Sequence, residues 1–202
     1  MDLRAQRRLL VACLCFLAWL GQRLGPPVPA AGDAPLAQTV PGAQVHVLGV
    51  GDGQAVLATC DGVAALIGAG PEWAGPAVAA YVRREGLTEL EAIILASDWG
   101  RHVGGVADVL SLMGVGAVYD AVPTAAGESH RRALEAAARL GIPYERLRAG
   151  QRLWLGCLEL RILAPVEGVP SEEQPAPPLT AGGVFLLTAE GQGILYAGNL
   201  DQ

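Results

Sequence analysis

The sequence predicts an α/β protein of the layered α+β type, in which helices pack on β-sheets. Short runs of strand-forming residues are separated by glycine-containing turns, and helical patterns with apolar residues three or four positions apart occur between them. The 202 residues suffice for one domain, and a composition of 51% hydrophobic and 17% charged residues excludes a disordered chain. The net charge of −6 does not supply the basic face that nucleic acid requires, so we expect no nucleic-acid partner.

The first part of the body is expected to form an antiparallel meander. Strand-like runs span residues 44–50, 54–60 and 63–68. The segments between them, G-D-G at 51–53 and D-G at 61–62, are strong signals for turns.

Helices and strands alternate in the middle of the chain. Pro76 favours the first turn of a helix, and Gly86 ends the same apolar pattern. Residues 92–96 (A-I-I-L-A) are continuously apolar, which is typical of a strand buried on both faces. The elements expected next are a helix at 106–113, a strand at 117–119 and a helix at about 129–140.

The last third of the chain returns to strand patterns. These patterns lie at 152–155, 158–164, 184–189 and 193–197. The stretch 165–183 is rich in proline and glutamate and has no periodic pattern, so we expect a loop there.

Residues 1–30 are expected to be a signal peptide or a membrane anchor, and residues 31–42 a linker of proline, alanine and glycine. Three arginines within the first eight residues precede the apolar run Leu9–Leu20, which is shorter than the roughly 20 residues that span a bilayer as a helix. The arginines favour a cytoplasmic amino terminus. We therefore expect an extracytoplasmic body, secreted after cleavage near Ala30 or tethered to the membrane by residues 9–20.

The four cysteines divide between this leader and the body. Cys13 and Cys15 lie in the apolar run, whereas Cys60 and Cys157 lie in the body. An oxidising compartment permits a disulfide between the latter two. Two buried, reduced cysteines fit the sequence equally well.

The residues best suited to chemistry follow the apolar strand at 92–96. The loop Ser97–Gly105 contains an alcohol, a carboxylate, an indole, a guanidinium and an imidazole before two glycines. Sites in layered α/β proteins form at the carboxyl ends of buried strands. This loop is therefore the candidate site.

Four segments of the body share their patterns with one known family. They read V-H-V-L-G-V-G-D-G-Q-A at 45–55, L-I-G-A-G at 66–70, I-L-A-S-D-W-G-R-H-V-G-G at 94–105 and L-Y-A-G-N at 195–199. In order, they resemble V-H-F-L-D-V-G-Q-G-D-A, L-I-D-A-G, I-L-T-H-P-H-A-D-H-I-G-G and L-L-T-G-D of the metallo-β-lactamase fold, most closely the hydrolase-like domains of ComEC-type competence proteins. The resemblance implies that residues 43–202 form part of an αββα sandwich that is incomplete at its carboxyl end.

The same resemblance implies that the metal site is largely lost. The family binds one or two metal ions through H-x-H-x-D-H, and the corresponding positions here hold Ser97, Trp99, Arg101 and His102. Of these, only His102 is a usual ligand, and an arginine cannot deprotonate to bind a dication. The remaining aspartate positions of the family correspond to Gly49, Gly68 and Asn199. We therefore expect no cofactor, with zinc or manganese bound only if some hydrolase activity persists.

These comparisons favour a non-catalytic binding or scaffolding module over an enzyme. Two alternatives stay open: a residual metal-dependent hydrolase of the phosphodiesterase or nuclease kind, and a decaying gene product without a selected role. Relatives continue past the strand at 193–197 with a further half of the fold. Without that half, we expect residues 184–187 (V-F-L-L) to lie on an uncovered sheet face, so that the body self-associates or binds a partner protein.

Overall fold

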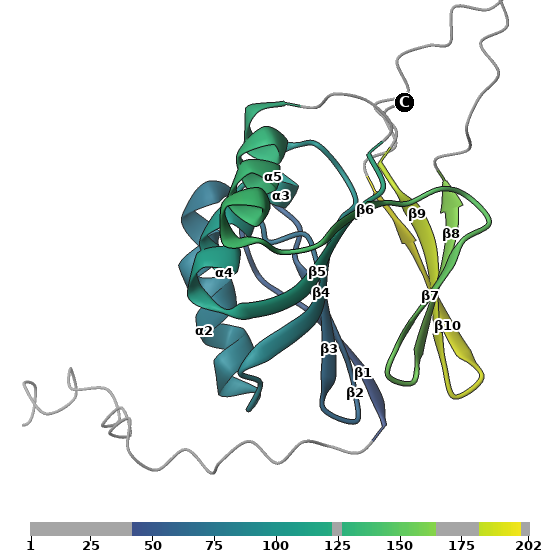
Figure 1. Cartoon of the computed structure of the whole chain (residues 1–202). Coiled ribbons are helices and arrows are strands. Elements are labelled where there is room, and N and C mark those ends of the chain that lie inside the picture. The colour runs from purple at the N-terminus through teal and green to yellow at the C-terminus, as the bar shows by residue number, and fades with distance from the viewer. Residues whose placement is uncertain (1–41, 123–126, 165–181, 199–202) are drawn as a thin grey trace, which may run out of the picture. The chain divides into compact units, whose positions relative to one another are not determined.

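The computed structural model describes residues 42–122, 127–164 and 182–198. They form two β-sheets and a layer of helices, which confirms the predicted fold class (Figure 1). The leader at 1–30, most of the linker, the greater part of the loop at 165–183 and Asn199 lie outside the described residues. No helix in the described part of the chain is long and apolar enough to cross a membrane.

The first sheet has six strands in the order β1-β2-β3-β4-β5-β6. They are β1 (Ala43–Val47), β2 (Val56–Cys60), β3 (Val63–Ile67), β4 (Glu89–Leu95), β5 (Gly114–Asp120) and β6 (Tyr144–Arg146). The strands β1, β2 and β3 form the expected antiparallel meander, and β3 to β6 are parallel to one another.

Helices cover one face of this sheet (Figure 1). They are the 3₁₀ helix η1 (Glu72–Ala74) and the α-helices α2 (Gly75–Arg84), α3 (Gly100–Val103), α4 (Val106–Leu112) and α5 (Glu128–Leu140). Pro76 lies in the first turn of α2, as expected. Gly141 ends α5 in a left-handed conformation with a φ of 68°, which glycine adopts without steric cost.

The second sheet is antiparallel and has four strands in the order β10-β9-β8-β7. They are β7 (Arg152–Leu155), β8 (Leu158–Ala164), β9 (Val184–Ala189) and β10 (Gln192–Ala197). Its inner face packs on the face of the first sheet that the helices leave free, and the two sheets share a continuous apolar core.

The strand β4 belongs to both apolar cores of the protein. Ile93 and Leu95 pack against the helices, whereas Ala92 and Ile94 pack in the core between the sheets. All four side chains are buried. This explains why the run at 92–96 has no polar alternation.

The expectation that residues 184–187 would lie uncovered was wrong for their inward side chains. Phe185 is 0% exposed and Leu187 is 6% exposed, because both pack in the core between the sheets. The two sheets therefore cover each other within the described residues. The outward side chains Val184 and Leu186 are only half-buried, and no described helix lies over that outer face.

Two short elements differ from the expectation. The strand β6 was not predicted, because its three residues are all exposed and show no apolar alternation. The helix α3 forms within the loop Ser97–Gly105, but four residues are too few for a helical period to be visible.

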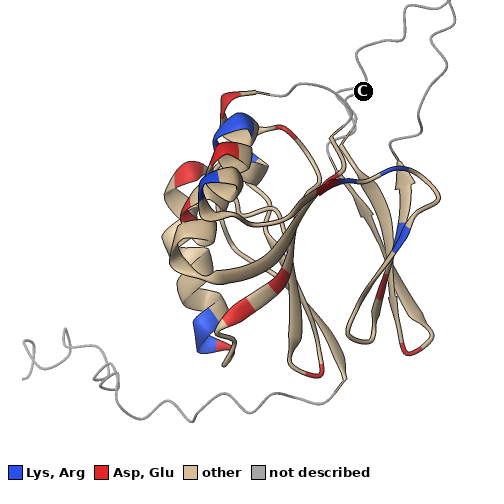
Figure 2. Cartoon of the chain, in the orientation of Figure 1, with Lys and Arg blue, Asp and Glu red and all other residues tan. Residues whose placement is uncertain are grey.

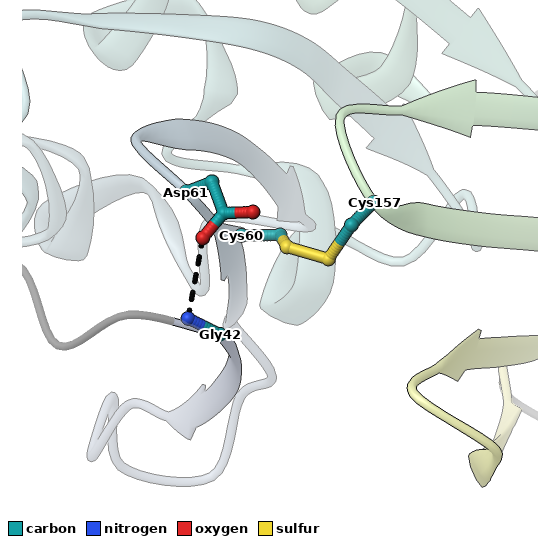
Figure 3. Close-up of a disulfide and its surroundings, with 4 residues drawn as sticks. All are labelled: Gly42, Cys60, Asp61 and Cys157. Carbon is teal, nitrogen blue, oxygen red and sulfur yellow. Dashed lines mark hydrogen bonds between the residues drawn. A yellow bond between two sulfur atoms is a disulfide. The ribbon is translucent and has the colours of Figure 1, made fainter.

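A disulfide joins the two sheets. Cys60 ends β2 and Cys157 lies in the turn between β7 and β8, with their Cα atoms 5.7 Å apart (Figure 3). Beside it, the backbone N–H of Gly42 donates a hydrogen bond to Asp61 Oδ1 at 3.2 Å. The disulfide closes a loop between residues 97 positions apart, so it restricts the unfolded chain strongly.

Replacing both Cys60 and Cys157 by alanine should lower the free energy of unfolding by roughly 3–5 kcal/mol, because the loop-closure entropy is lost. Denaturation in guanidinium chloride, followed by circular dichroism, measures the change. A reductant should destabilise the wild-type chain and leave the double variant unaffected. An unchanged wild-type midpoint, with both thiols shown to be free, would contradict the prediction.

Candidate functional site

The candidate loop begins directly after β4, at the carboxyl end of the parallel strands. Ser97 is 1% exposed, and its Oγ accepts a hydrogen bond from the backbone N–H of Trp99 at 3.1 Å. The hydroxyl thus holds the turn that leads into α3. In this structure, Ser97 has a local structural role.

Backbone hydrogen bonds fasten this loop to two neighbouring loops. The carbonyl oxygen of Arg101 accepts from the N–H of Gln54 at 3.2 Å, and that of His102 accepts from the N–H of Ala69 at 2.7 Å. The N–H of Gly105 donates to the carbonyl of Gly70 at 3.0 Å. Three loops therefore form one connected rim at this end of the sheet.

Arg101 extends to the turn between β1 and β2. Its Nη1 lies 3.0 Å from Asp52 Oδ2, and both side chains are mostly exposed. An exposed ion pair stabilises a protein by at most about 1 kcal/mol. At the site, the negative charge of Asp52 balances the positive charge of Arg101.

His102 is the one motif position with a metal-binding side chain. Its Nδ1 is buried without a hydrogen-bond partner among the described residues, and its ring lies 5.9 Å from the Trp99 ring. Burial, and secondly the charge of Arg101, lower the pKa of His102 below its usual value, although Asp98 acts in the opposite direction. These surroundings therefore favour the neutral form of the imidazole.

Gly68 occupies the position of an aspartate in the resembling family, and its surroundings leave no room for a side chain. Its φ is +65°, and an added Cβ would lie 2.8 Å from the carbonyl oxygen of His102 and 2.9 Å from that of Gln54. Both atoms belong to the backbone of the connected rim. Around Gly49, by contrast, an added Cβ would meet nothing within 4 Å.

The described residues contain one group of three potential metal ligands, and it lies elsewhere. It consists of Cys60, Asp61 and Cys157, and the two cysteines are joined in the disulfide. At the motif positions, Ser97 holds a turn, Arg101 pairs with Asp52, and the Trp99 ring lies 5.9 Å from that of His102. His102 is left as a single imidazole.

A buried polar cluster, which we call the Asp120 cluster, lies beside the loop and was missed by sequence reasoning. Asp120 is 0% exposed; its Oδ2 lies 3.0 Å from His130 Nε2 and accepts from the Tyr144 hydroxyl at 2.8 Å. Its Oδ1 accepts from the N–H of Val122 at 2.9 Å. Burial, followed by the contact with Asp120, raises the pKa of Tyr144. The cluster joins β5, α5 and β6, so we interpret it as structural.

No local sequence signal marks the Asp120 cluster. Its three members are separated by 10 and 14 residues, and only the pairing of β5 with β6 and the packing of α5 bring them together. His130 lies on α5 and is not one of the four motif positions.

Solved structures with the same fold are metallo-β-lactamases. A metallo-β-lactamase with an HARLDQ motif from Cronobacter sakazakii matches with a TM-score of 0.54 and 20% identity, covering 83% of this chain and 65% of that one. The Rm3 metallo-β-lactamase matches with a TM-score of 0.54 and 19% identity, covering 86% and 65%. MIM-1 from Novosphingobium pentaromativorans matches with a TM-score of 0.51 and 21% identity, covering 84% and 65%.

These matches show the metallo-β-lactamase fold. Because the sequence identities are so low, the matches give information about the fold and not about the activity. The chain spans less than two thirds of the length of each of these proteins. No family model matches the sequence, and no curated protein matches it.

Replacing Gly68 by alanine tests how tightly the rim closes around this position. Gly62 is the matched control, because its φ of +87° is also positive but an added Cβ there would meet nothing within 4 Å. Gly62→Ala should cost about 1–2 kcal/mol from backbone strain. Gly68→Ala should cost a further 1–3 kcal/mol or so from the contact with two carbonyl oxygens. If both variants lose the same free energy of unfolding in chemical denaturation, the backbone of the rim can move aside for a side chain at residue 68.

Proposed function

We propose that this protein is an exported, non-catalytic binding module with a metallo-β-lactamase fold and kinship to the ComEC-type competence proteins. The kinship is supported by the order and spacing of the four motif-like segments between residues 45 and 199. Fold similarity does not identify an activity, so the proposal depends on the residues at the site.

The observation that carries the proposal is the set of side chains at the four motif positions. A catalytic zinc ion needs three protein ligands and an open position, and His102 is the single ligand type present. Ser97 is hydrogen bonded to the Trp99 backbone, and the permanently charged Arg101 is paired with Asp52. Since Gly68 also lacks space for a carboxylate, these residues do not fit a catalytic metal ion.

A binding role is supported by the exposed side chains on the rim. Trp73 and Trp99 are 67% and 38% exposed, and Arg101 is exposed beside them. Trp73 packs near Gly51 and Arg101 pairs with the adjacent Asp52, so both lie around the same turn. Tryptophan and arginine are enriched among residues that dominate the free energy of protein interfaces.

The purified protein should contain no stoichiometric zinc or manganese, since His102 is the one remaining ligand at the motif positions. Elemental analysis after dialysis against metal-free buffer measures the content. The same preparation should not hydrolyse a generic phosphodiester above the rate of the His102→Ala variant.

One metal ion per chain that is lost in His102→Ala would contradict the proposal. Phosphodiester turnover that disappears with that metal would favour the alternative, a residual metal-dependent hydrolase. The matched control is His46→Ala. This histidine lies away from the motif, and its Nδ1 is hydrogen bonded to the Tyr81 hydroxyl at 2.9 Å.

Export is supported by two features of different kinds. The apolar run Leu9–Leu20 follows three arginines, as in signal peptides and anchors. The disulfide between Cys60 and Cys157 is stable in oxidising compartments outside the cytoplasm.

Expression of the full chain in a bacterial host should place the body outside the cytoplasm. Mass spectrometry of the exported protein should find a new amino terminus near Ala30. An intact Met1 on a membrane-bound chain would show that residues 1–30 are a retained anchor and not a cleaved signal peptide. Recovery of the whole chain in the cytoplasm, with Cys60 and Cys157 reduced, would contradict export.

A further inference from the structure

Among the residues that the structure describes, the strand β10 is an open edge of the second sheet. Its residues, Gln192–Ala197, include no charged side chain and no proline. Ile194 is 50% exposed and Leu195 is 61% exposed, and they lie on opposite faces of the strand. An uncharged, apolar edge strand is a template for pairing with another strand.

Of the three other sheet edges, β1, β6 and β7, the last two have features that oppose such pairing. The strand β6 has three residues, two of which are Glu145 and Arg146, and β7 has four residues and begins with Arg152. Short, charged edges resist strand addition. Figure 2 shows charged residues on the helices and on several strands of both sheets, whereas β10 is uncharged along its length.

The turn before β10 determines which backbone groups face the open edge. Glu190 and Gly191 both have positive φ, 50° and 77°, which is typical of a two-residue type I′ hairpin turn. In such a hairpin, Ala189 and Gln192 form a hydrogen-bonded pair, and the pairs alternate along the strands from there. Residues 193, 195 and 197 therefore direct their N–H and C=O groups away from β9.

We propose that β10 pairs antiparallel with β10 of a second copy of this chain, with the two-fold axis at Leu195. Hydrogen-bonded pairs across the new edge must join outward-facing residues. Centring the pairing on Leu195 uses all three of them, because Gly193 then lies opposite Ala197 of the second copy. The proposal deepens the proposed function by naming what this binding module binds.

The side chains suit this register. On the outer face, Leu195 would contact Leu195 of the second copy, flanked by the small residues Gly193 and Ala197. On the inner face, Ile194 would lie beside Tyr196 of the second copy. No charged residue opposes another across the five paired positions, residues 193–197, although the chain as a whole has a net charge of −6.

A cleft with both polar and apolar lining residues lies beside β10. It has a volume of about 450 Å³ and opens between the edge strands β1 and β10. Its lining includes the apolar residues Val45, Leu158, Leu187 and Ile194 and the polar residues Glu190 and Gln192. Leu158 and Leu187 are already buried, so a second copy that covers the open side of this cleft would chiefly remove Ile194, which is 50% exposed, from water.

The pairing also closes on itself. A two-fold contact uses the same edge in both copies, so it yields dimers and leaves no further β10 edge free. The two four-stranded sheets would become one continuous sheet of twice that number of strands.

The test compares the wild-type full-length chain with Leu195→Lys in a mild non-ionic detergent, by multi-angle light scattering and sedimentation velocity. Leu140→Lys is the matched control, because Leu140 is 51% exposed on α5, away from β10. We expect dimers for the wild type and for Leu140→Lys. We expect Leu195→Lys to dissociate at least about tenfold more readily, since it places two ammonium groups opposite each other.

The register is tested by cross-linking in a chain with Cys13 and Cys15 changed to serine. Leu195→Cys should form an intermolecular disulfide on mild oxidation, whereas Trp154→Cys, on β7 and 65% exposed, should not. A monomeric wild type, open-ended association, equal dissociation of both lysine variants or equal cross-linking of both cysteine variants would each overturn the proposal. The metal content of the same preparation tests the proposed non-catalytic function independently of the dimer.

Discussion

The burial of β4 on both faces is the constraint on which the rest of the structure depends. Ile93 and Leu95 need the helix layer, and Ala92 and Ile94 need the second sheet. Removing either layer would expose large aliphatic side chains, each of which contributes about 1.5–3 kcal/mol when buried. A single sheet with helices on one side would therefore leave this strand half uncovered, and the second sheet provides the missing cover.

The second sheet is held at both of its ends as well as through its apolar face. At one end, the disulfide joins Cys157 to Cys60 of β2. At the other, the N–H of Gly183 donates to the carbonyl of Ala96 at 2.6 Å, and the N–H of Gly198 donates to the carbonyl of Gly183 at 2.9 Å. The candidate loop thus begins where the two sheets are joined by backbone hydrogen bonds, which limits how far it can move.

Most of the fold could be predicted from the sequence, because apolar periodicity and turn glycines are local signals. The helices α2, α4 and α5 and nine of the ten strands lie close to their expected positions. The place of the loop Ser97–Gly105 at the carboxyl end of β4 could also be predicted, because the loop follows a continuously apolar run. The Asp120 cluster and the closed surroundings of Gly68 could not be predicted, because they depend on which distant backbone atoms the fold brings together.

The tight glycines of the rim also bear on how this protein can evolve. At Gly68, the carbonyl oxygens of Gln54 and His102 occupy the space that a larger residue would need, and at Gly53 an added Cβ would lie 2.3 Å from the carbonyl oxygen of Arg101. A substitution of Gly68 by aspartate would therefore place its side chain against these carbonyl oxygens and destabilise the rim. A side chain at residue 68 requires the backbone at Gln54 or His102 to move, whereas the open surroundings of Gly49 impose no such requirement.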